Sequence, residues 1–121
     1  MNYNDQLSVL AKNLDRNEAM WKKWVEYGVK PDTMLEVDFF FTTNSQSAKD
    51  ALLKQFEGTS MNVSAGETRR HLIFKSYYIQ ITLPKEIWTL EKLNAKTVEF
   101  FHLGLKTSQD LILDGNGATM P

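Results

Sequence analysis

Few side chains in this sequence could carry out chemistry, and none of them forms a catalytic set. The two histidines, His71 and His102, are far apart in the chain, and neither has a second histidine or a carboxylate at a metal-ligand spacing. We expect His71 to begin a strand, half exposed, and His102 to lie on the surface of a helix. The chain has no cysteine, which excludes a thiol nucleophile, a thiolate metal site and a disulfide framework. These observations predict neither an enzyme nor a metal or cofactor site.

The hydroxyl and carboxylate groups do not change this expectation. Ser45, Ser47 and Ser60 fall in predicted caps and turns, without the glycine pattern of a nucleophile elbow. Residues 114–117 read Asp-Gly-Asn-Gly and look like part of a calcium loop, but the later bidentate glutamate is missing. Because glycine and asparagine tolerate positive φ, we predict a tight turn there.

Basic residues cluster locally at one predicted hairpin turn, which contains Arg69, Arg70, His71 and Lys75. We interpret this cluster as a solvated turn; the alternative is a contact with an acidic patch or a phosphate. Across the chain, 14 Lys and Arg against 15 Asp and Glu give a net charge of -1, without the positive surplus that phosphate contacts favour. Residues 75–81 also lack the glycine of the RNA-recognition signature, so RNA binding is a disfavoured alternative.

The totals predict one globular domain over residues 1–121. A hydrophobic content of 42% and a charged content of 24% are ordinary for a soluble protein of this length. The first residues lack the basic and apolar regions of a secretory signal, and no apolar run approaches the roughly 18 residues that span a bilayer. We therefore expect a cytoplasmic protein without a membrane partner.

The strand predicted over residues 34–43 organises the other elements. Its side chains alternate with the period of two that is typical of one buried and one mostly wet face. The apolar side carries Leu35, Val37, Phe39 and Phe41, and the other side carries Glu36, Asp38, Phe40 and Thr42. Further strands are predicted at residues 61–65, 72–83 and 111–113, with a polar turn at 66–70. A bulge or an irregular hairpin is expected near Lys75 and Ser76, because strict alternation would bury Lys75.

Helices are predicted over residues 5–28, 45–57 and 89–105. The first is either one helix or a pair that breaks at residues 15–17, with Asn17 capping the second half. Its apolar stripe fits packing on its own domain or pairing with another chain, which leaves the oligomeric state open. This stripe consists of Leu7, Leu10, Leu14, Trp21 and Trp24. The order, helix then β-α-β-β-α-β, predicts an α+β, ferredoxin-like core over residues 34–117: a four-stranded antiparallel sheet with two helices on one face, plus the extra N-terminal helix.

Several segments in this order resemble the regulator of ribonuclease E activity B family. They are residues 28–32, the strand at 37–41, the helix at 48–56 closed by Gly58, the helix start at 89–93, and residues 114–118. The resemblance runs from about Trp24 to Ala118. Members of the family carry Asp-Gly-Trp-Gly near the end, so Asn116 is a departure.

The resemblance implies a small ferredoxin-like protein that binds and inhibits ribonuclease E, without catalysis or a cofactor. The best-known members end in a strongly acidic tail, whereas this sequence stops at Pro121 just after the predicted turn. If that tail holds the basic partner, inhibition is weaker here or the partner is another protein.

The predicted sheet has a side that faces away from the helices, and we name it the open sheet face. Its residues are Glu36, Asp38, Phe40, Tyr78, Gln80, Asp110, Ile112 and Asp114, with Asn62 and Ser64 beside them. This surface combines rings and acids without Lys or Arg, which suits a basic polypeptide segment through ion pairs and cation–π contacts. The alternative is that the acids only keep the wet face of an antiparallel sheet soluble. The predicted function is a protein-binding inhibitor of ribonuclease E-type processing; a stand-alone interaction or immunity-type module is the alternative.

Overall fold

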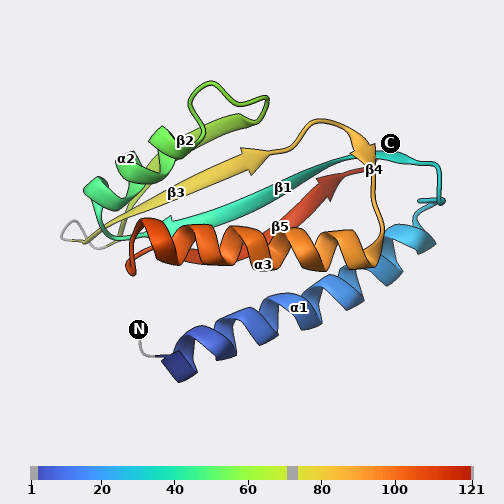
Figure 1. Cartoon of the computed structure of the whole chain (residues 1–121), viewed down its shortest axis with the longest axis horizontal. Helices are drawn as coiled ribbons and strands as arrows, with labels where there is room; N and C mark the ends of the chain where they lie inside the picture. Colours follow the sequence, from blue (N-terminus) through green and yellow to red (C-terminus); the bar gives the residue numbers. More distant parts are fainter. Residues whose placement is uncertain (1–2, 71–73, 121) are drawn as a thin grey trace.

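The computed structural model describes residues 3–70 and 74–120, and within them the side chains of all but Tyr3, Arg69, Arg70 and Phe74. The described part is an α+β fold with three helices and an antiparallel sheet of five strands (Figure 1). The elements are α1 (Tyr3–Glu26), β1 (Met34–Thr43), α2 (Gln46–Gln55), β2 (Asn62–Arg70), β3 (Phe74–Thr82), β4 (Glu86–Ile87), α3 (Leu90–Thr107) and β5 (Ile112–Thr119). His71 and the predicted strand start at Leu72 lie outside the described residues.

β1 lies at the centre of the sheet. It pairs with β3 through residues 38–43 and with β5 through residues 36–42, and β2 pairs with the far side of β3. Four strands therefore follow the order β2-β3-β1-β5. The fifth is β4, which places Ile87 opposite Met34 and was not expected from the sequence. β4 follows Pro84, which has no backbone N–H to donate to the sheet. Beyond this residue the chain returns to β1 and pairs with it.

The predicted alternation of β1 is confirmed. Leu35, Val37, Phe39 and Phe41 are buried, while the residues between them are partly exposed. α2 and α3 cover the buried side. Phe100 of α3 places its ring 4.5 Å from that of Phe39 and 6.0 Å from that of Phe56, between centroids. Ring packing thus fixes both helices over one face of the sheet.

α1 is one continuous helix that lies beside α3 on the same face (Figure 1). Of the two alternatives, the single helix is the one observed, and the break at residues 15–17 does not occur. Asn17 is 1% exposed and does not cap a helix, because its side chain finds partners outside α1. Those partners form a group that we name the asparagine cluster: Asn17, Asn94, Thr97 and Asn116.

The asparagine cluster joins α1, α3 and β5 through side-chain hydrogen bonds. The Asn17 amide donates to Asn94 at 3.0 Å and to the Thr97 hydroxyl at 2.9 Å. The Asn116 amide donates to Asn17 at 2.8 Å and to Thr97 at 3.2 Å. The Thr97 hydroxyl donates a hydrogen bond to the Leu93 carbonyl at 2.8 Å. Asn17 and Thr97, the two buried members of the cluster, therefore both have hydrogen-bond partners, as burial demands.

Three local predictions are wrong. Residues 66–70 do not form a turn but continue β2, paired with residues 74–78. The β2–β3 register runs without a shift past Lys75 and Ser76, so no bulge occurs there. Lys75 is exposed even without a bulge, so strict alternation does not bury it. Residues 114–117 are part of β5, and no glycine in that stretch has positive φ.

The irregularity that sequence reasoning placed on β3 occurs on β5. Phe40 lies opposite Gly115 and Phe41 opposite Leu113, so Asp114 is the extra residue of a bulge. The bulge restores the alternation that puts Asn116 opposite Phe39, on the helix side. Among the described helices, none has both the length and the apolar character needed to cross a bilayer.

Candidate protein-binding face

The open sheet face is the side of β1 that carries Glu36, Asp38 and Phe40. These side chains are partly exposed, whereas their neighbours on the chain are buried beneath the helices. The three described helices all pack on the opposite face, either directly on the sheet or against α3. The predicted division of β1 into a covered and an uncovered side is therefore present.

Strand register brings four of the predicted residues together. Gln80 of β3 lies directly opposite Phe40. Tyr78 of β3 and Ile112 of β5 both lie opposite Thr42, one on each side of β1. Directly opposed residues in antiparallel strands have side chains on the same face within about 5 Å of each other at Cβ. Phe40, Tyr78, Gln80 and Ile112 thus form one continuous patch.

A glycine makes room for one of the two aromatic rings of this patch, and another glycine lies in contact range of the second ring. The Tyr78 ring occupies the space that a Cβ on Gly66 would need, so it lies across β2. A Cβ on Gly117 would lie 3.8 Å from the Phe40 ring. Tyr78 remains 46% exposed in this arrangement. The Tyr78 ring therefore lies along the sheet surface over β2 while much of it stays exposed.

Two acids lie at one end of the patch. Asp38 lies two positions before Phe40, on the same side of β1. Its carboxylate accepts a hydrogen bond of 2.5 Å from the Thr82 hydroxyl. Glu36 lies two positions before Asp38 and is opposite Thr119. Within the described residues, no ion pair involves Glu36 or Asp38. Their negative charges are therefore available to a ligand.

Asp114 is placed differently from the prediction. It is exposed at the β5 bulge, and its main-chain carbonyl accepts a hydrogen bond of 2.7 Å from the Arg16 guanidinium. Arg16 reaches this edge from α1 and also donates to Asn13. The expectation of a surface without Lys or Arg therefore fails at the β5 edge, where an arginine lies beside Asp114.

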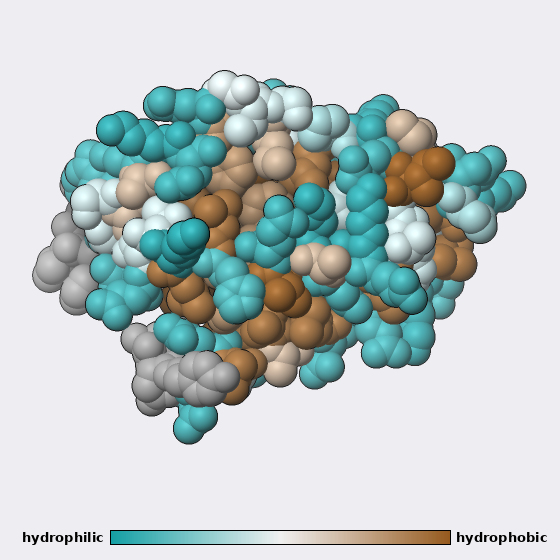
Figure 2. Space-filling model, viewed as in Figure 1, coloured by the Kyte–Doolittle hydropathy of each residue, from teal (hydrophilic) through white to brown (hydrophobic). Residues whose placement is uncertain are grey.

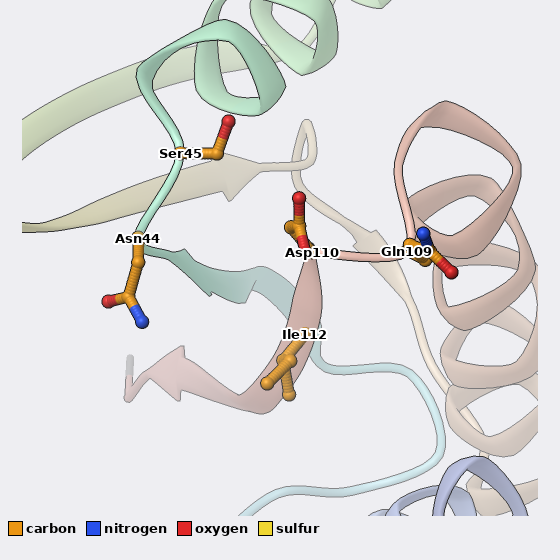
Figure 3. Close-up of a pocket in the computed structure, with 5 residues that line it drawn as sticks. All are labelled: Asn44, Ser45, Gln109, Asp110 and Ile112. Atoms are coloured by element: carbon orange, nitrogen blue, oxygen red, sulfur yellow. The ribbon is translucent and has the colours of Figure 1, made fainter. Parts of the chain in front are cut away.

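Asp110 lies at the edge of the patch, near Ile112. It precedes β5 and lines an open polar hollow of about 510 Å³ with Asn44, Ser45, Gln109 and Ile112 (Figure 3). The hollow lies where β1 ends and α2 begins, and Ser45 caps α2 by accepting from the Ala48 amide. The Asp110 carboxylate would repel an anion at this helix start, so the hollow does not suit an anion.

Sequence reasoning missed three residues of this surface. Met34 and Ile87 lie opposite each other and are 51% and 48% exposed, which extends the patch with apolar area beyond Glu36. Met34 has the same parity as Glu36 and was predictable; Ile87 was not, because nothing in its two-residue strand carries a periodic signal. Thr82, the partner of Asp38, follows from the parity of Gln80.

None of the described His, Cys, Asp and Glu side chains gather in a group of three that could hold a metal ion. His102 is exposed on α3, as predicted, with its ring edge-on to Phe101. What the geometry presents is a surface for contact.

Comparison with known proteins adds one finding. The family model described as Regulator of ribonuclease activity B matches residues 14–117. A sequence search against curated proteins found no match. The matched range includes β1 and β3, all of β5 except its last two residues, and about half of α1.

Proposed function

The chain belongs to the Regulator of ribonuclease activity B family, and on that premise we propose that it inhibits ribonuclease E-type RNA processing by docking on the enzyme. The family implies regulation of ribonuclease activity. The docking surface in this proposal is the open sheet face, and its ligand is a basic segment of the ribonuclease. The strand order β2-β3-β1-β5 with helices on one side supports a ferredoxin-like arrangement for the core.

The observation that carries the proposal is the combination of Phe40 and Asp38 on adjacent positions of one side of β1. An arginine or lysine over the Phe40 ring would gain a cation–π contact, worth about 0.5–2 kcal/mol. The same cation would lie near the Asp38 carboxylate, which has a hydroxyl partner but no ion pair among the described residues. Tyr78 offers a second ring two residue positions along the sheet.

The mechanism in this proposal is steric. A basic segment held on the open sheet face is unavailable to its RNA or to the other proteins of the processing assembly. No bond is made or broken by the regulator. Electrostatic attraction chiefly raises the association rate, so binding should weaken as ionic strength rises.

The test is calorimetric titration of purified ribonuclease E, and of its basic segments, with the wild-type chain and two charge variants. Asp38→Asn removes the charge but keeps an oxygen that accepts from Thr82, so the fold should persist. We expect a loss of affinity of about fivefold to tenfold, which corresponds to roughly 1–1.4 kcal/mol. Phe40→Ala should lower the affinity by a similar factor.

The matched control is Glu57→Gln, which removes the same charge from an exposed residue after α2. It should bind like the wild type. If Asp38→Asn, Phe40→Ala and Glu57→Gln all bind as the wild type does, the open sheet face is not the docking surface. If ribonuclease E does not bind at all, the chain is an interaction module for a different partner. Binding of single-stranded RNA by the wild type would favour the RNA-binding alternative.

A further inference from the structure

The two long outer strands of the sheet, β5 and β2, differ in how far their backbone groups are satisfied. β5 lies against α1, and Asn13 Nδ2 donates to the Leu113 carbonyl at 3.0 Å. Arg16 donates to the Asp114 carbonyl at 2.7 Å, at the bulge that interrupts this strand. β2 pairs with β3 and with no other described strand. The long free edge of the sheet is therefore the outer edge of β2.

The outer edge of β2 is regular along its whole length. The strand has nine residues, Asn62–Arg70, and its register with β3 has no shift. In an antiparallel pair every second residue turns its N–H and C=O away from the partner strand, so these groups of β2 face outward. The strand contains neither a proline nor a bulge, two features that protect natural edges. Such an edge is suited to pairing with another strand.

The middle of β2 carries small side chains that let a second strand approach. Residues 64–66 are Ser-Ala-Gly, and Ser64 and Ala65 are exposed. α2 packs chiefly over β3 and β1, so the edge extends beyond the helix layer. Figure 1 shows β2 at the margin of the sheet, and in Figure 2 that margin has mainly the pale and teal tones of small and polar side chains.

Tyr78 supplies an independent observation at the midpoint of this edge. Gly66 is the central residue of β2, and the hydroxyl end of the Tyr78 ring lies over it, in the space that a Cβ would need. The Tyr78 side chain is 46% exposed, and its hydroxyl has no hydrogen-bond partner among the described residues. A phenol hydroxyl both donates and accepts, so it is complementary to a second copy of itself.

Charge selects the register of such a self-pairing. Glu67 is the one charged residue among the described side chains of β2. A two-fold axis at Gly66 would pair the whole strand with itself and set Glu67 opposite Ala65 of the copy. An axis at Glu67 would instead oppose two carboxylates, which is destabilising. The axis at Gly66 therefore keeps like charges apart and brings the two Tyr78 hydroxyls close together.

We propose that the outer edge of β2 is a self-association surface, on which a second copy of this chain pairs antiparallel about a two-fold axis at Gly66 and joins the two sheets into one. The Tyr78 hydroxyls of the two copies hydrogen-bond across the axis. Because directly opposed residues share a face, both open sheet faces lie on the same side of the joined sheet. The dimer then offers two docking surfaces to a partner with repeated basic segments, which raises avidity. This last consequence rests on the proposed function, whereas the pairing itself does not.

Sedimentation velocity of the whole chain, from about 1 µM to about 1 mM, tests the pairing. We expect a reversible monomer–dimer equilibrium with a dissociation constant of roughly 10–100 µM, because one strand pair buries little apolar area. No ribonuclease is present, so failure of this test is distinct from failure of the proposed function.

Two charge variants make the result specific to the register. Ala65→Glu places a carboxylate opposite Glu67 of the copy and should weaken association by about tenfold or more. Adding Glu67→Lys to that variant replaces each repulsion by an ion pair and should restore association. The matched control is Ala19→Glu, the same change at an exposed alanine of α1, which should associate like the wild type. Circular dichroism checks that each variant keeps its fold.

Engineered cysteines read the register directly, because the chain has no cysteine of its own. With the axis at Gly66, Ser64 lies opposite Thr68 of the copy, at a separation that a disulfide can bridge. The double variant Ser64→Cys/Thr68→Cys should therefore form covalent dimers under mild oxidation. Ser64→Cys alone should not, because the two copies of residue 64 lie four positions apart.

Three results would overturn the proposal. One is a folded chain that stays monomeric at about 1 mM. Another is an Ala65→Glu variant that associates as well as the wild type. The third is a dimer in which Ser64→Cys/Thr68→Cys forms no more covalent dimer than Ser64→Cys alone.

Discussion

The asparagine cluster is expected to hold α1 on the rest of the fold, and Asn17→Ala tests this. The substitution removes two donated hydrogen bonds, to Asn94 and Thr97, and one accepted from Asn116. A typical intramolecular hydrogen bond contributes about 1 kcal/mol net. Asn116 keeps its bond to Thr97, and Asn94 is partly exposed and can turn to water, so the penalty is below that of three orphaned groups.

The Asn17 side chain is 1% exposed, so its removal also leaves a small cavity between α1, α3 and β5. Taking the hydrogen bonds and the cavity together, we expect a loss of about 2–4 kcal/mol in the free energy of unfolding. For a chain of this length, that corresponds to a fall in melting temperature of roughly 8–15 °C.

Urea unfolding followed by circular dichroism at the helix band measures this loss, with the slope of the transition compared between variants. The matched control is Asn4→Ala, which makes the same change on the same helix at an exposed residue and should cost less than about 0.5 kcal/mol. A loss below about 1 kcal/mol for Asn17→Ala, at unchanged slope, would show that the cluster does not anchor α1.

Three further predictions follow from close contacts. Gly104→Ala should destabilise the protein by about 1–3 kcal/mol in chemical unfolding, because the new Cβ would lie 2.8 Å from the buried Phe41 ring; Phe41→Leu in the same chain should recover part of the loss. Gly66→Ala should change stability by less than about 1 kcal/mol but displace the exposed Tyr78 ring from β2, which is measured as lost nuclear Overhauser contacts between that ring and residue 66. Lys92→Ala should cost about 1 kcal/mol, since its ammonium holds a carboxylate, the Ile87 carbonyl and a tryptophan ring while partly exposed; a loss indistinguishable from zero would refute this.

Local periodicity predicted the parts of the fold that repeat along the chain. The alternation of β1 and the apolar spacing of α3 each follow from one buried side, so the strand, the helix and the inward residues Val37, Phe39 and Leu93 could be read from the sequence. The helix caps could be predicted as well. The Ser45 and Thr89 side chains each accept a hydrogen bond from the backbone amide three residues ahead, as predicted.

The predictions that failed concern residues whose partners lie far away in the sequence. Asn17 resembles a cap until Asn94 and Asn116, 77 and 99 residues further on, provide its hydrogen bonds. The glycines of residues 114–117 resemble a turn, although their pairing with β1 makes them a strand. On the candidate surface, Phe40, Tyr78, Gln80 and Ile112 were predictable from parity, but Arg16 at the β5 edge was not, because the position of α1 was unknown.

The central place of β1 has a consequence for how the chain reaches its native state. Its two long neighbours, β3 and β5, come from residues about 40 and about 80 positions further along. Neither side of β1 can therefore be paired by a local hairpin. By contrast, β2 and β3 are consecutive strands in regular register and can pair early, at a small entropic cost of loop closure. We expect the β2–β3 hairpin to appear first in pulse-labelled hydrogen exchange, with β1 and β5 gaining protection together in a slower phase.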